Sequence, residues 1–201
     1  MGTRGAVGFR LNGEDYINYN HYDSYPEHSG CYVLQQLRYW MGSPVEQLAA
    51  APTVVWIDRL KERVAAMKPL ARLEWAGDRL DACLAHGVYA PAADFLRDSL
   101  FCEWAYIVNL DAKTLEVYTG FCRRKHTKGR YSSWEPAVRT GSMTQPCYAV
   151  ALIQEFDFDA LQEEGVFITE VRRAADEHAT WDRERERRAA KANTTHRRAR
   201  Q

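Results

Sequence analysis

The pattern of apolar and polar residues predicts two β-hairpins. In residues 5–11 the apolar side chains of Val7, Phe9 and Leu11 stand at every second position. Asn12-Gly13 then supplies the two positive-φ residues that a tight type I′ turn requires. Residues 14–22 provide the returning strand of this first hairpin. In the second hairpin, residues 104–108 and 115–118 are rich in β-branched and aromatic side chains and flank a short polar turn.

Apolar residues at helical spacing predict the helices. One helix begins after the cap at Ser29-Gly30 and ends at Gly42-Ser43-Pro44. Four further helices are expected, namely over 53–67, over 78–86, after Pro91, and from about Val166 into the C-terminal tail.

Residues 148–156 hardly alternate and predict a strand that is buried on both faces. Two hairpins, one such strand and clustered helices indicate an α+β fold with a mainly antiparallel sheet. We expect one domain over residues 1–182 and a charged helical tail over 183–201, of which the last ten residues are disordered. Because this tail lacks an apolar stripe, its deletion from Arg183 is expected to leave thermal stability nearly unchanged.

The overall charge is balanced, but its distribution along the chain is not. The 27 basic and 27 acidic side chains cancel. Eight Lys or Arg and two acidic residues follow from position 183 onward, so the tail carries +6 and the preceding body −6.

Several classes of protein are disfavoured by the sequence. Neither a secretion signal nor an apolar run of the roughly 20 residues that a membrane span requires is visible. The five cysteines form no C-x-x-C pair, which favours reduced thiols in the cytoplasm. Phosphate-loop, dinucleotide and metal-ligand motifs are also missing, so we expect neither a cofactor nor a metal ion.

Three short motifs resemble a family of uncharacterised proteins. They are Met-Gly-Thr-Arg-Gly at 1–5, Tyr-Asn-His-Tyr-Asp-Ser-Tyr-Pro at 19–26 and Cys-Glu-Trp-Ala-Tyr at 102–106. Members of this family begin Met-Gly-Thr-Arg and occur in bacteriophages, actinobacteria and fungi. The resemblance implies an intracellular or phage-borne protein and implies no activity.

A looser likeness concerns the first hairpin, which starts near residue 1 and whose second strand ends in Asn-x-x-Asp. It resembles the opening of N-terminal-nucleophile hydrolases, which implies an amidohydrolase with Thr3 as nucleophile. Cleavage of Gly2-Thr3 would have to free the α-amine that serves as its base. The alternative is that Thr3 and Arg4 only lead into the first strand, with Arg4 paired to a carboxylate such as Asp23.

The polar segment at the end of the first hairpin is a second candidate site. His21 and Asp23 point to one face of an extended stretch, where a hydrogen bond between them would make the imidazole more basic. The alternative is a turn whose polar groups satisfy the backbone. The candidate binding residues of this rim are Asn20, Tyr22 and Tyr25.

Two further positions could carry chemistry. Cys31 stands at a helix start, which favours a thiolate, and His21 or His28 could act as its base. The alternative for Cys31 is a small core residue. Glu103 lies at a strand end, where carboxylates often face a pocket.

The long loop at 122–147 holds closely spaced cations and nearby aromatic residues, a combination that can grip phosphates and stack a base. The alternative is a solvated surface loop. Its candidate binding residues are Arg123, Arg124, Lys125, Arg130 and Trp134.

The sequence thus leaves three functions open. The first is a binding protein that uses the polar-aromatic rim and the basic loop to contact a protein, a nucleotide or a nucleic acid. The second is the Thr3 amidohydrolase, and the third is a Cys31 thiol hydrolase. Because both hairpins are expected to share a sheet, we expect Thr3 or Arg4, the segment 20–23 and Glu103 to converge on one cleft.

Overall fold

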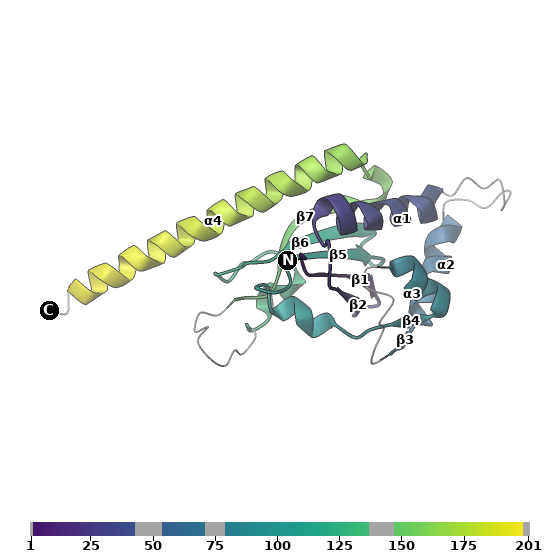
Figure 1. Cartoon of the computed structure of the whole chain (residues 1–201), viewed down its shortest axis with the longest axis horizontal. Coiled ribbons are helices and arrows are strands. Elements are labelled where there is room, and N and C mark those ends of the chain that lie inside the picture. The colour runs from purple at the N-terminus through teal and green to yellow at the C-terminus, as the bar shows by residue number, and fades with distance from the viewer. Residues whose placement is uncertain (1, 43–53, 71–78, 137–146, 199–201) are drawn as a thin grey trace.

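The computed structural model describes residues 2–42, 54–70, 79–136 and 147–198. A five-stranded sheet with the order β2-β1-β5-β6-β7 forms its centre (Figure 1). Because four helices of the described ranges accompany this mostly antiparallel sheet, the fold is α+β, as the sequence predicts. The strands are β1 (Gly5–Leu11), β2 (Glu14–Asn20), β5 (Trp104–Asn109), β6 (Thr114–Thr119) and β7 (Ala151–Asp157).

Both predicted hairpins are present, and they are joined side by side. Asn12 and Gly13 have φ values of 53° and 81°, so the first turn takes the conformation that the sequence predicts. The Asp111 carboxylate accepts hydrogen bonds from the Asn12 and Gly13 amides at 2.8 and 3.0 Å, which ties the two turns together. At the junction β1 pairs with β5 in parallel, whereas the remaining pairings of this sheet are antiparallel.

One face of the sheet is covered by helices and carries the larger core. Phe9, Leu115 and Val117 of the sheet pack there against Leu34 and Phe167 of two helices. Figure 1 shows α1 and α4 lying along this face, with α2 and α3 beside the turn end of the first hairpin. The helices are α1 (Cys31–Gly42), α2 (Val54–Ala65), α3 (Leu80–His86) and α4 (Glu164–Arg198).

Turns cover the opposite face of the sheet. Ile17, Ile107 and Tyr118 pack there against Leu96 and Tyr131, which belong to two short 3₁₀ turns. These turns are η2 (Ala93–Arg97) and η3 (Arg130–Ser133), and two more short turns are η1 (Pro26–Gly30) and η4 (Phe158–Ala160). A small parallel pair, β3 (Lys68–Pro69) and β4 (Val88–Tyr89), lies apart from the main sheet.

Three predictions of secondary structure need correction. The segment after Pro91 forms the short turn η2 instead of a helix. β7 is an edge strand with several partly exposed residues, so it is not buried on both faces. The helix α4 continues to Arg198, although disorder is expected for the last ten residues; residues 199–201 lie outside the described part.

Part of the prediction falls on residues that the structure does not describe. The stop signal at Ser43-Pro44 and the segment 137–146 of the long loop lie there. In the described ranges, no helix combines the length and apolar character needed to cross a bilayer.

Candidate functional site

One end of the sheet gathers several of the predicted site residues. The backbone amide of Ser24 donates to the Thr3 carbonyl oxygen at 3.3 Å, and the Arg4 amide donates to Oε1 of Glu103 at 3.4 Å. The chain start, the loop after β2 and Glu103 are therefore neighbours, whereas the single cleft expected between them stays a prediction. The Arg4 guanidinium, however, lies over the Phe101 ring at 5.3 Å from its centroid. The suggested partner Asp23 is engaged by Tyr25 instead.

The loop after β2 is organised by Asn20. This side chain is buried, and its Nδ2 donates to the hydroxyls of Ser24 at 2.9 Å and Ser29 at 3.0 Å. Asn20 therefore holds the loop in shape and is not available at a binding rim. Tyr22, in contrast, is 65% exposed.

The expected His21–Asp23 hydrogen bond is not formed. Nδ1 of His21 lies 2.6 Å from the Tyr19 hydroxyl, while Asp23 accepts a hydrogen bond from the Tyr25 hydroxyl at 2.9 Å. The reason is that Asp23 has a φ of 50°, so the chain turns where the prediction assumes an extended stretch. The hydrogen-bonded pair that the sequence suggested for His21 and Asp23 is therefore replaced by two separate contacts to tyrosine hydroxyls.

Cys31 does not stand at a free helix start. The π-helical turn η1 precedes it directly, and the Cys31 amide donates to carbonyl oxygens of that turn. Burial raises the pKa of the Cys31 thiol, which is the opposite of what a nucleophilic thiolate requires.

The basic loop divides into an inward and an outward part. Arg130 points inward and pairs with the carboxylates of Glu116 and Asp15. Trp134 is half-buried and stacks with the Arg97 guanidinium, 4.2 Å from its ring centroid. These two residues therefore stabilise the loop-covered face, and Arg130 is not free to grip a phosphate.

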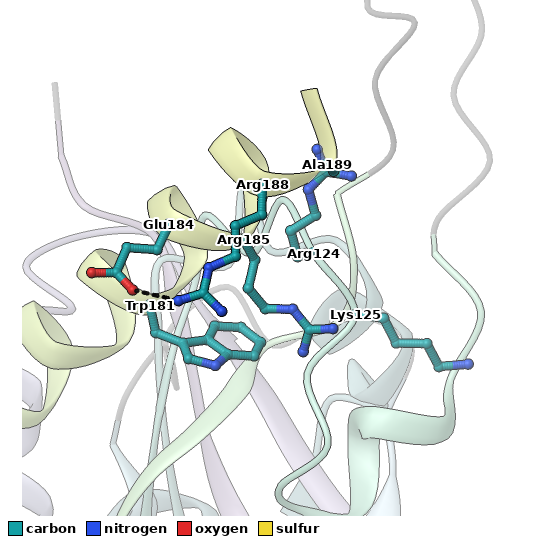
Figure 2. A pocket seen from close by; sticks show the side chains of 7 residues that line it. All are labelled: Arg124, Lys125, Trp181, Glu184, Arg185, Arg188 and Ala189. Carbon is teal, nitrogen blue, oxygen red and sulfur yellow. Dashed lines mark ion pairs between the residues drawn. The ribbon is translucent and has the colours of Figure 1, made fainter. Parts of the chain in front are cut away.

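Arg124 and Lys125 instead line a groove against α4. We call this the cationic groove; its volume is about 650 Å³. Figure 2 shows the loop cations on one side and the helix residues on the other. The lining residues are Arg124, Lys125, Trp181, Glu184, Arg185, Arg188 and Ala189.

The helical repeat explains why these α4 residues share the groove. Trp181, Arg185 and Arg188 stand at positions i, i+4 and i+7, which lie on one face of a helix. The Arg185 guanidinium lies over the Trp181 ring, 5.0 Å from its centroid, so the indole supports this cation.

The loop is anchored to α4 beside the groove. The Arg123 amide donates to Oδ2 of Asp182 at 2.9 Å, and the Arg123 guanidinium lies 3.8 Å from Glu186. The buried His126 ring sits between the carbonyl oxygens of Lys128 and Ala149 at 3.1 and 3.0 Å. Hydrogen bonds therefore hold the loop on both sides of Arg124 and Lys125, the two loop residues that line the groove.

Beneath the anchor, Cys122 and His178 are packed together. Sγ of Cys122 lies 3.7 Å from Nε2 of His178. Burial raises the pKa of the Cys122 thiol to about 12 and lowers the pKa of His178. Because the thiol is fully buried, this pair stabilises the contact of loop and helix and does not offer a nucleophile.

The charges of the groove are poorly neutralised. Four cations face one carboxylate, Glu184, which lies 3.8 Å from Arg188. In the described part of the chain, the buried Nε of Arg124 has no hydrogen-bond acceptor. No three His, Cys, Asp or Glu side chains of the described ranges are grouped so that they could hold a metal ion. An anion is thus the ligand that this groove favours.

The sequence interpretation missed the helix side of the groove. It treats residues from Arg183 onward as a tail without a packed face, whereas Arg185 and Arg188 stand opposite the basic loop. The spacing of Trp181, Arg185 and Arg188 is visible in the sequence, but the proximity of the loop is not.

The comparisons with known proteins found no similar protein. No protein-family model matches the chain, and neither a curated protein nor a solved structure is significantly similar to it.

Proposed function

We propose that this protein is a nucleic-acid-binding protein that contacts the phosphate backbone through the cationic groove. The observation that carries the proposal is the gathering of Arg124, Lys125, Arg185 and Arg188 around Trp181, from two segments far apart in the sequence. Arginine guanidinium groups are well suited to phosphate oxygens because they donate in a fixed planar fork.

Two further features favour a polymer over a small anion. The cations continue along α4 beyond the groove, with Lys191, Arg197 and Arg198. Figure 1 shows that this part of α4 extends away from the sheet, so it can follow a long ligand. An aromatic ring among the cations adds a stacking surface, which a nucleic acid can use.

The test compares two double variants of the same helix. Arg185→Gln/Arg188→Gln removes two groove cations, whereas Arg183→Gln/Arg187→Gln removes two exposed cations that do not line the groove. Both lower the net charge by two. Binding of a fluorescein-labelled 20-nucleotide DNA to the full chain is measured by anisotropy over a series of salt concentrations.

We expect the groove variant to bind more weakly than wild type, with a salt slope smaller by about 1.4–1.8 because two phosphate contacts are lost. The control variant is expected to lose clearly less. Equal losses in both variants would contradict a role of the groove, and an absence of binding by the wild type would refute the proposal.

A further inference from the structure

Exposed aromatic residues flank the strands at one end of the sheet. β2 ends at Asn20, β1 begins at Gly5, β5 begins at Trp104 and β6 ends at Thr119, so these positions share one end. Just beyond these strand ends are Tyr22, Phe101 and Phe121, whose side chains are 65%, 39% and 54% exposed.

The segments that contain these residues flank neighbouring strands. The strand order β2-β1-β5-β6 places the four flanking segments in this order along the sheet end. Their residues Tyr22, Arg4, Phe101 and Phe121 are what we call the aromatic row. Arg4 stacks on Phe101, so a cation stands among the rings.

Phe121 links the aromatic row to the groove. Only Cys122 and Arg123 separate it from Arg124, so the two Cα atoms are at most roughly 11 Å apart. Its backbone is held firmly, because its amide donates to the Ser99 carbonyl oxygen at 2.6 Å. Its φ of 56° is unusual for an aromatic residue, and such strained backbone is frequent where a side chain must be presented.

We infer that the ligand of this surface is a single-stranded nucleic acid, whose phosphates occupy the cationic groove while a base stacks on Phe121. This inference rests on the proposed function. Bases of a duplex are stacked on each other, whereas those of a single strand are free to stack on exposed rings. A basic groove beside exposed aromatic rings is the combination that single-strand binders use.

The first test uses the wild-type full chain and three labelled ligands of equal length. These are a 20-nucleotide single strand, the 20-base-pair duplex, and an abasic single strand that keeps the phosphates and lacks the bases. We expect the ordinary single strand to bind at least tenfold more tightly than the other two.

The second test removes the ring of Phe121. Stacking of one base is worth about 1–3 kcal/mol, which corresponds to roughly 5- to 150-fold in affinity. Phe121→Leu is therefore expected to weaken single-strand binding within that range and to leave duplex binding unchanged. Phe121→Tyr keeps the ring and should bind as wild type. Tyr39→Leu, which removes a 64%-exposed ring from α1, is the matched control.

The outcomes separate this inference from the proposed function. Equal affinity for single strand, abasic strand and duplex would overturn the inference while the groove remains a phosphate-binding site. Binding of none of the three ligands would overturn both. Because the ligand comparison uses only the wild-type protein, it decides the matter even if a variant fails to fold.

Discussion

Glu116 is the buried residue that holds Arg130 of the basic loop inside the protein. Its side chain is 4% exposed and accepts hydrogen bonds from Asn109 at 2.6 Å, from the Tyr118 hydroxyl at 2.8 Å and from Arg130. A buried carboxylate of this kind requires a cation, and Arg130 provides it. The Arg130 guanidinium therefore forms its ion pairs inside the protein, although the basic residues next to it in the sequence suggest a surface cation.

The first residue-scale prediction concerns this buried pair. Glu116→Gln removes the carboxylate and leaves the half-buried Arg130 paired with Asp15 alone, so we expect a loss of about 3–5 kcal/mol in the free energy of unfolding. Urea denaturation followed by circular dichroism measures the change.

The matched control is Glu155→Gln, because Glu155 is the cross-strand neighbour of Glu116. Burial and the repulsion from Glu116 raise the pKa of Glu155. Neutralising it is expected to leave stability unchanged or to raise it slightly. A stability loss in the control as large as that of Glu116→Gln would contradict the assigned role of the buried pair.

The second residue-scale prediction concerns pH. The pKa of His178 is lowered from its ordinary 6.5, chiefly by burial, so the unfolded chain binds a proton at this residue more readily than the folded one. Stability is expected to fall as pH decreases below about 6.5. His178→Gln should make the free energy of unfolding less dependent on pH between roughly 7 and 5. An unchanged pH dependence in this variant would refute the assignment to His178.

At the scale of elements, the hairpins and α4 differ in how far local sequence determines them. Asn12-Gly13 encodes its turn locally, because both residues tolerate positive φ. The burial of β7, in contrast, could not be predicted from its local sequence. Its run of apolar residues suggests burial on both faces, but its place at the sheet edge is a tertiary property.

The helix α4 is one element that serves two purposes. Phe167 and Val171 near its start belong to the core, and Asp182 further along anchors the basic loop. The helix passes through position 183 without interruption. The charged helical tail expected for residues 183–201 is thus the end of a longer helix, and two of its residues, Arg185 and Arg188, line the cationic groove.

Truncation of α4 provides the element-scale prediction. A chain ending at Ala190 keeps the anchor and the groove, so its melting temperature should equal that of the full chain. A chain ending at Glu177 loses His178 and Asp182, which exposes the Cys122 thiol and leaves the Arg123 amide unpaired. We expect a marked fall in its melting temperature and rapid labelling of a thiol.

Deletion from Arg183 gives a chain that ends at Asp182, intermediate in length between these two truncated chains. It removes the exposed Arg123–Glu186 pair, which contributes at most about 1 kcal/mol, and leaves Asp182 in the last helical turn. Equal melting temperatures for the chains ending at Ala190 and Glu177 would show that α4 does not anchor the loop.

At the scale of the whole molecule, charge is segregated. The body carries −6 and residues 183–201 carry +6, and the cationic groove forms where the two meet. An acidic body repels a polyanion from most of the surface, while the basic helix attracts it. Such a distribution would guide a nucleic acid to the groove and to the neighbouring aromatic row.

The local features of this protein follow from residues that are neighbours in the sequence. Alternation and the Asn12-Gly13 turn predicted the first hairpin, and β-branched and aromatic residues predicted the second. Helical spacing predicted the helices, although it was wrong after Pro91, where η2 forms. Each of these signals acts between residues a few positions apart. Which cations face outward and which are buried, in contrast, depends on how distant segments pack together. Arg130 and Arg124 are six positions apart in one loop, yet one is paired with Glu116 and the other lines the groove. Their partners are distant in sequence, and only the packing of the sheet and α4 brings those partners within reach.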